Sequence, residues 1–137
     1  MITLEMTWPA VVESIPMVTA WIDEALEKLD CAIKAQMQID VAIDEMFGNI
    51  AHYAYPDKKG SATVRLDFDA ATRMFSITIL DQVIPFDPLE QKEPDTSLGS
   101  EERSIGGLGI FLVKKTMDEV SYQYMGGSNV LCLKKRI

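Results

Sequence analysis

Two polar residues near the middle of the chain have the types and the spacing to do chemistry together. Glu45 and Asn49 stand four positions apart in a segment with helical periodicity, so both side chains are expected on one helix face, one turn apart. A carboxylate can take a proton from an attacking hydroxyl group, and an amide oxygen can ligate Mg²⁺. The pair also resembles the polar edge of an amphipathic helix, and taken alone it fits that simpler interpretation better.

A third polar residue, Asp81, ends an expected strand. It follows the alternating segment 75–80 and precedes a stretch that contains two prolines and a second aspartate. An acid at such a position can simply cap a turn. A carboxylate where a buried strand ends can also accept a hydrogen bond from an adenine amino group.

A glycine cluster leads directly into an expected helix. It consists of Gly106, Gly107, Leu108 and Gly109. Glycines at this place bring backbone N–H groups close to a ligand at the positive end of the helix dipole, which suits phosphate. The cluster could equally be a flexible loop that enters a helix. It is not a Walker P-loop, because no Gly-Lys-Ser/Thr follows and no unit of parallel strands surrounds it.

The hydrophobic pattern changes its period along the chain and predicts the elements that position these residues. Alternation of apolar and polar residues predicts strands, and apolar residues three or four apart predict helices. Ser14 and Pro16 resemble the N-cap and the first residue of a helix. The expected elements, in chain order, are a strand over 2–6 closed by Pro9, a helix from Ser14 to about Leu29, a helix from about Ala32 to Ala54, strands over 62–68 and 75–79 joined by a turn over 69–73, a loop over 85–104, a helix from about Leu108 to Met117, and strands over 120–125 and 130–135.

This order of elements predicts the fold class. It is an α+β fold, a two-layer sandwich with helices on one face of a mostly antiparallel sheet. No repeat, low-complexity tract or linker divides the sequence, so residues 1–137 are expected to form a single domain. A long loop such as 85–104 inside a compact domain is typical of a functional or a mobile segment.

Composition narrows the class of protein. A formal net charge of −8 argues against a nucleic-acid binder, because phosphate contacts need a lysine and arginine surface. No apolar run approaches the roughly 20 residues of a membrane span, and no signal peptide opens the chain, so a cytoplasmic protein without membrane contact is expected. Cys31 and Cys132 match no metal or redox spacing and are expected to be two reduced thiols. The single histidine, His52, excludes a His-rich metal site and is expected to have a structural or hydrogen-bonding role.

Three motifs in register resemble the GHKL ATPases, the family of gyrase, MutL and the histidine kinases. Residues 45–55 (EMFGNIAHYAY) look like the N-box, residues 81–88 (DQVIPFDP) like the first glycine box, and residues 105–113 (IGGLGIFLV) like the second, which 117–120 (MDEV) continue. Within the family, the sequence is most similar to the RsbW/SpoIIAB-type anti-sigma factor serine kinases. The resemblance extends over about residues 1–136, and the first forty carry no diagnostic motif.

The resemblance implies a Bergerat-type ATP-binding fold, and it assigns roles to the residues named above. Asn49 would hold the Mg²⁺ that bridges the triphosphate, and Glu45 would orient or deprotonate the nucleophile. Asp81 would read the adenine amino group.

The resemblance also assigns the phosphate side of the site. Gly106, Gly107 and Gly109, with Leu108 between them, would shape the wall beside the phosphates. Residues 100–105 would be part of a lid, in which Arg103 could steady the γ-phosphate, as positive groups do in phosphoryl transfer.

One position departs from the family pattern. The family usually has glycine two residues after the adenine-reading acid, and this chain has Val83. Glycine there permits unusual backbone angles or close approach of a ligand, and valine does so only if the backbone is extended. Val83 is nevertheless counted with the expected ATP-binding residues.

The function implied by the resemblance is that of an ATP-dependent serine/threonine protein kinase. Such a kinase phosphorylates a STAS-type anti-anti-sigma protein and sequesters a sigma factor, and proteins of this type often form homodimers. The alternative is a non-catalytic binding module of the same fold, in which Val83 has weakened nucleotide binding. The detached catalytic domain of a histidine kinase fits less well, because no dimerising helix with a phosphoacceptor histidine is present.

Overall fold

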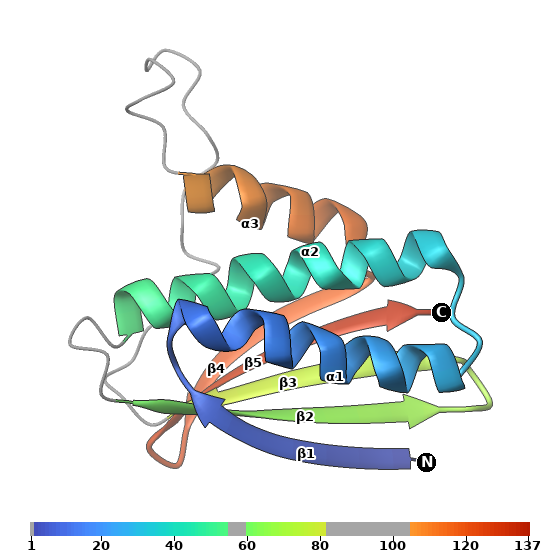
Figure 1. Cartoon of the computed structure of the whole chain (residues 1–137), viewed down its shortest axis with the longest axis horizontal. Coiled ribbons are helices and arrows are strands. Elements are labelled where there is room, and N and C mark those ends of the chain that lie inside the picture. The colour runs from blue at the N-terminus through green and yellow to red at the C-terminus, as the bar shows by residue number, and fades with distance from the viewer. Residues whose placement is uncertain (1, 55–59, 82–104) are drawn as a thin grey trace.

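The computed structural model describes residues 2–54, 60–81 and 105–137. Within them the chain forms one five-stranded sheet in the order β1-β2-β3-β5-β4, and every neighbouring pair is antiparallel. The helices all lie on one face of this sheet (Figure 1). The strands are β1 (Ile2–Pro9), β2 (Ser61–Asp69), β3 (Met74–Asp81), β4 (Glu119–Met125) and β5 (Ser128–Arg136). The predicted α+β fold class is confirmed.

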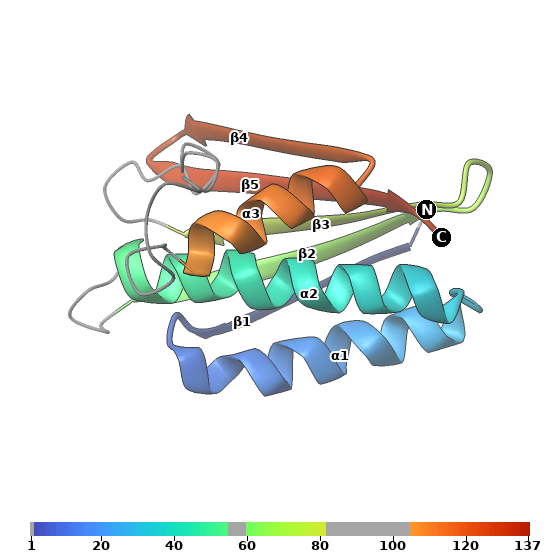
Figure 2. The ribbon, with the colours of Figure 1, turned by 90° about the horizontal axis from the view of Figure 1, so that it is seen from above.

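Three helices make up the second layer, with α2 in the middle between α1 and α3 (Figure 2). A short 3₁₀ turn precedes α1, and a π-helical turn follows α2. The helical segments are the 3₁₀ turn Val12–Ser14, α1 (Ile15–Lys28), α2 (Ile33–Asn49), the π-helical turn Ile50–Ala54 and α3 (Ile105–Thr116). The second helix was expected to run to Ala54, and the structure changes its helix type after Asn49. Isolated π-helical turns occur frequently at functional sites.

β2 and β3 show why the sheet has one buried face. Their side chains alternate in burial along the whole of each strand. Val64 and Ile77, both fully buried, point toward the helices, whereas Thr63, Arg65 and Thr78 point to the uncovered face. The core therefore lies between this side of the sheet and the inner faces of the helices. The pattern is the one that the period of the sequence predicts.

The ends of two helices differ from the prediction. Ser14 occupies the N-cap position of α1, as expected, but its hydroxyl makes no capping hydrogen bond. Its backbone is already helical (φ −79°, ψ −20°) at the end of the 3₁₀ turn, whereas a capping residue typically has an extended backbone. Pro16 lies in the first turn of α1, as expected.

α3 begins at Ile105, so Gly106 and Gly107 lie inside its first turn and do not precede it. Packing of α3 against α2 outweighs the low helix propensity of glycine there.

The turn between β4 and β5 has the backbone conformation that its two glycines favour. β4 and β5 are joined by Gly126 and Gly127, which have φ angles of 61° and 79°. Both residues therefore adopt the left-handed conformation that a two-residue hairpin turn requires and that glycine allows.

Cys31 and Cys132 are free thiols, as predicted. Within the described part of the chain, no helix has the length and apolar character of a membrane span.

Candidate functional site

The C-terminal end of α2 brings Glu45 and Asn49 one turn apart, as the spacing predicts. Asn49 is only 4% exposed, and its side-chain amide donates a hydrogen bond to the carbonyl oxygen of Glu45 at 2.6 Å. This bond uses the Nδ2 end of the amide and fixes its orientation. The Oδ1 atom of Asn49 is buried and accepts no hydrogen bond from the described residues.

An unsatisfied buried acceptor is costly, by about 1–3 kcal/mol, and such an atom indicates a missing partner. A hard cation is a partner that suits an amide oxygen, and asparagine is a Mg²⁺ ligand in other phosphoryl-transfer sites. The described residues contain no group of three or more His, Cys, Asp or Glu side chains that could hold a metal by themselves. The chemistry of Asn49 therefore fits a Mg²⁺ ion that takes its remaining ligands from water and from a bound phosphate.

Glu45 lies half-buried beside this amide. Burial raises the pKa of its carboxyl above the ordinary value, and the negative charge of Asp44 raises it further. A raised pKa makes the ionised carboxylate a better proton acceptor. The environment of Glu45 therefore increases the proton affinity of its carboxylate.

α3 approaches Glu45 closely through one glycine. A Cβ atom placed on Gly109 would overlap the carboxyl group of Glu45, including both of its oxygens. Gly109 is itself buried. Two predicted site residues from different motifs thus meet, and the absence of a side chain at Gly109 leaves the space that the carboxyl group occupies.

Asp81 ends β3 and is 3% exposed. Its Oδ1 atom accepts a hydrogen bond of 2.8 Å from the side-chain amide of Asn129, its direct cross-strand partner on β5. The hydroxyl of Tyr122 on β4 donates in turn to Oδ1 of Asn129. The three side chains form a chain of hydrogen bonds across three strands, which holds the Asp81 carboxylate in one orientation.

Sequence reasoning missed Asn129 and Tyr122. Gly126 and Gly127 fix the register of β5 against β4. The register of β5 against β3, which places Asn129 opposite Asp81, is set by tertiary structure instead. Polar residues at inward positions of two strands, where apolar residues are the rule, would have identified the pair.

The remaining predicted site residues are only partly described. The backbones of Gly106, Gly107 and Leu108 lie in the first turn of α3. Val83 and Arg103 lie outside the described residues. The C-terminal ends of α2 and β3 and the N-terminal end of α3 are found at one edge of the molecule in both views (Figures 1 and 2). The structure therefore gathers the elements of the three motifs at this edge.

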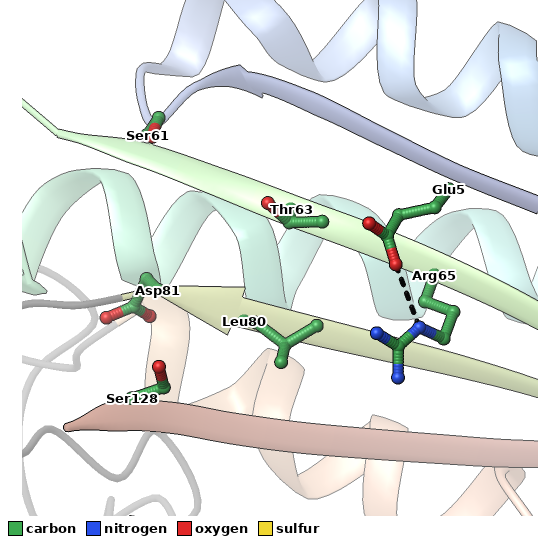
Figure 3. Close-up of a pocket in the computed structure, with 7 residues that line it drawn as sticks. All are labelled: Glu5, Ser61, Thr63, Arg65, Leu80, Asp81 and Ser128. Carbon is green, nitrogen blue, oxygen red and sulfur yellow. Dashed lines mark hydrogen bonds and ion pairs between the residues drawn. The ribbon is translucent and has the colours of Figure 1, made fainter. Parts of the chain in front are cut away.

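A cavity of about 330 Å³ lies on the uncovered face of the sheet. Figure 3 shows its lining, in which Arg65 and Glu5 form an ion pair at 2.9 Å. The lining residues are Glu5, Ser61, Thr63, Arg65, Leu80, Asp81 and Ser128. Asp81 borders this cavity, whereas Glu45, Asn49 and Gly109 do not line it. The candidate site is therefore the region between α2, α3 and the end of β3.

Comparison with known proteins identifies the family of the chain. A family model described as the histidine kinase-like ATPase domain matches residues 8–135, which is nearly the whole chain. The chain belongs to this family. The resemblance to the GHKL family, and within it to the RsbW type, is thereby confirmed.

Curated members of the family show the same relationship. The serine-protein kinase RsbW of Bacillus velezensis is 28% identical over 137 residues, and the match covers 96% of this chain and 84% of the relative. RsbW of Bacillus subtilis is 26% identical with the same coverage. The family membership thus extends over the full α+β fold.

Two solved structures share the fold of this histidine kinase-like ATPase domain. The RsbU and RsbW domains of a Mycobacterium tuberculosis protein give a TM-score of 0.68 at 17% identity, over 99% of this chain and 32% of that chain. The SiaB–SiaC complex from Pseudomonas aeruginosa gives a TM-score of 0.60 at 17% identity, over 98% of this chain and 89% of that chain. At this level of identity the likeness concerns the fold.

Proposed function

We propose that this chain is a Mg²⁺–ATP-dependent serine/threonine protein kinase that also acts as an anti-sigma factor in a bacterial partner-switching circuit. Asn49 is the observation that carries the proposal. Its buried Oδ1 has no hydrogen-bond partner among the described residues, and it lies one turn from a half-buried carboxylate with a raised pKa. An amide oxygen that can hold Mg²⁺ and a carboxylate that can accept a proton are two of the groups that phosphoryl transfer to a hydroxyl group uses.

The residues of the chain take distinct roles in the proposed reaction. The serine or threonine Oγ of the partner attacks the γ-phosphorus, the bond from this phosphorus to the β–γ bridging oxygen breaks, and ADP leaves. Glu45 accepts the hydroxyl proton. Asn49 Oδ1 would hold Mg²⁺, which when bound neutralises charge on the triphosphate oxygens.

Other residues would bind the nucleotide at either end. Asp81, held by Asn129, would accept a hydrogen bond from the adenine amino group. The first turn of α3, with its glycines, would offer backbone N–H groups to the phosphates. Arg103 would steady the γ-phosphate.

The named relatives support a protein as the binding partner. The curated relatives are serine-protein kinases, and one solved neighbour is a complex of SiaB with SiaC. We infer that the substrate is a STAS-type anti-anti-sigma protein, that the sequestered protein is a sigma factor, and that the kinase works in the cytoplasm as a homodimer. The net charge of −8 is consistent with protein partners that carry basic faces.

Incubation with ATP, Mg²⁺ and a STAS-domain protein encoded in the same genome tests the kinase activity. The expected result is a mass increase of one phosphoryl group on a serine or threonine of the STAS protein. The Glu45→Gln variant should bind ATP and transfer phosphate at least about a hundredfold more slowly, since general-base catalysis contributes about 10²–10⁴-fold. Failure to phosphorylate any STAS protein of that genome, with ATP bound, would contradict the kinase activity.

A further inference from the structure

α2 carries three large apolar side chains on its solvent side. Ile33 is 76% exposed, Met37 is 62% exposed and Val41 is 50% exposed. They are four residues apart, so they form one straight stripe along the helix. We call these three residues the outer stripe. Asp44 continues the same line and ends it with a charge.

The core does not need the outer stripe. The opposite side of α2 already provides a buried face that packs on the sheet and the neighbouring helices, and it includes Ile39, Ile43 and Phe47, all fully buried. Figure 2 looks down on the helix layer and shows α2 in its middle, between α1 and α3. The stripe therefore lies on the N-terminal half of the middle helix of this layer. Contiguous exposed apolar residues rimmed by polar ones mark interaction sites on soluble proteins.

The dimensions of the stripe suit a helix. The eight steps from Ile33 to Val41, at a rise of 1.5 Å each, give a length of about 12 Å, which is a little over two helical turns. A partner helix recognises such a surface through its own side chains at i, i+3 or i+4 and i+7. An extended strand would need unpaired backbone groups, and these are not found along the side of a helix.

The charges beside the stripe indicate which charge a partner helix should carry. Between residues 23 and 44 the chain has six acidic and two basic residues. One of the six acids, Asp40, has a pKa raised to about 7, so five remain fully charged at neutral pH. Lys28, one of the two basic residues, forms an ion pair with Glu24 at 3.3 Å. Lys34 is the other. On the other side of α2, α3 ends with Lys114 and Lys115, and Lys115 lies over the ring of Phe111. The excess of negative charge therefore lies on the α1 side of the stripe.

We propose that the outer stripe and its acidic α1 flank bind a basic amphipathic helix of a protein partner. The apolar side of that helix covers Ile33, Met37 and Val41, and its lysine or arginine side faces α1. A second copy of this chain fits less well, because pairing two outer stripes would bring two acidic flanks together. The proposal does not rest on the nucleotide site, because none of the three residues lies near Asn49 in the sequence or contributes to its contacts.

A direct test uses the full chain and a fluorescently labelled amphipathic helical peptide of leucine and lysine, about 18 residues long so that it forms a stable helix. A matched peptide has glutamate in place of every lysine. The leucine–lysine peptide should bind, the leucine–glutamate peptide should not, and added salt should weaken the binding. Met37→Gln should weaken the binding about tenfold.

Met17→Gln and Met125→Gln are the matched controls, because Met17 and Met125 are 54% and 57% exposed and lie outside the stripe. Both should bind the leucine–lysine peptide as the parent does, and so should Asn49→Ala. Equal binding by Met37→Gln and the parent would overturn the proposal, as would equal binding of the two peptides. Self-association that Met37→Gln abolishes in sedimentation velocity would also overturn it, in favour of a second copy.

Discussion

The carboxyl group of Glu45 on α2 occupies the space that a side chain at residue 109 of α3 would fill. Because Gly109 has no Cβ atom, α3 can pack against the one helix turn that carries both Glu45 and Asn49. The glycine motif and the acid–amide motif are therefore joined by direct contact, and the position of the proposed general base depends on a residue from another part of the sequence.

Gly109→Ala tests this dependence. The added methyl group must displace the Glu45 carboxyl group, which is the mobile end of a flexible side chain, so the fold should survive while catalysis suffers. We expect phosphoryl transfer to fall by about a hundredfold, in the range that loss of a general base causes. The thermal midpoint should change by only a few degrees.

Gly48→Ala is the matched control for Gly109→Ala. A Cβ atom at Gly48 would meet only Cδ1 of Ile15, at an ordinary 3.8 Å. Its activity should equal that of the parent. Equal activity of the two alanine variants would contradict the role given to Gly109.

Asn129→Ala tests the hydrogen-bond chain behind Asp81. The variant removes the 2.8 Å bond that orients the buried carboxylate, so ATP should bind about tenfold more weakly and the preference for ATP over GTP should shrink. Tyr122→Phe should have a smaller effect in the same direction. Isothermal titration with each nucleotide measures both quantities. Tyr124→Phe, at a 45% exposed position of the same strand as Tyr122, is the control.

The ratio of ATP to GTP affinity shows whether Asn129 orients Asp81 or only supports the sheet. If Asn129→Ala lowered stability but left the ratio of ATP to GTP affinity unchanged, Asn129 would support the sheet without orienting Asp81.

Asp40 on α2 predicts a dependence of stability on pH. Burial and the neighbouring Asp23 on α1 raise the pKa of its carboxyl from 3.8 to about 7. The folded state therefore holds a proton that the unfolded state has lost, so the free energy of unfolding should fall as pH rises from about 4 to about 7 and change little above that.

Asp40→Asn should remove this loss. The variant should be more stable than the parent at pH 8, by on the order of 1 kcal/mol once solvent screening of a half-buried group is allowed for, and about equally stable at pH 4. Urea unfolding at the two pH values measures the difference. An equal change at both values would show that ionisation of Asp40 is not the cause, and Asp44→Asn, an exposed acid on the same helix, provides the comparison.

Val83→Gly decides between the kinase and the non-catalytic module. If valine weakens the nucleotide pocket, glycine at this position should tighten ATP binding about tenfold, because it restores the backbone freedom usual in the family. If the parent binds ATP well and the substitution changes nothing, Val83 is compatible with the site as it stands. Titration of both proteins with ATP and Mg²⁺ distinguishes these outcomes.

The elements of the fold were predictable because their period is local information. The alternation in β2 and β3 and the apolar spacing in α2 each determine one buried face, and Gly126 and Gly127 indicate a tight turn directly. The start of α3 was not predictable, because packing on α2 decides it. The 3₁₀ turn that contains Ser14 was not predicted, because this turn has no sequence signal of its own.

The candidate site was predictable in its parts but not in its contacts. Glu45, Asn49, Asp81 and Gly109 were identified by type and motif, whereas the contact of Gly109 with Glu45 depends on how two helices pack. The support of Asp81 by Asn129 depends on a cross-strand register between residues far apart in sequence. Such relationships are set by tertiary structure, which periodicity does not describe.

The central claim is that the buried Oδ1 atom of Asn49 holds Mg²⁺ for a bound ATP molecule. Isothermal titration of the parent and of Asn49→Ala with ATP, in the presence of Mg²⁺ and then of EDTA, tests it most directly, with thermal unfolding to verify that both proteins are folded. The parent should bind ATP much more tightly with Mg²⁺ than without it, and Asn49→Ala should lose that difference. Equal dependence on Mg²⁺ in both proteins, or no binding of ATP by the folded parent, would contradict the claim.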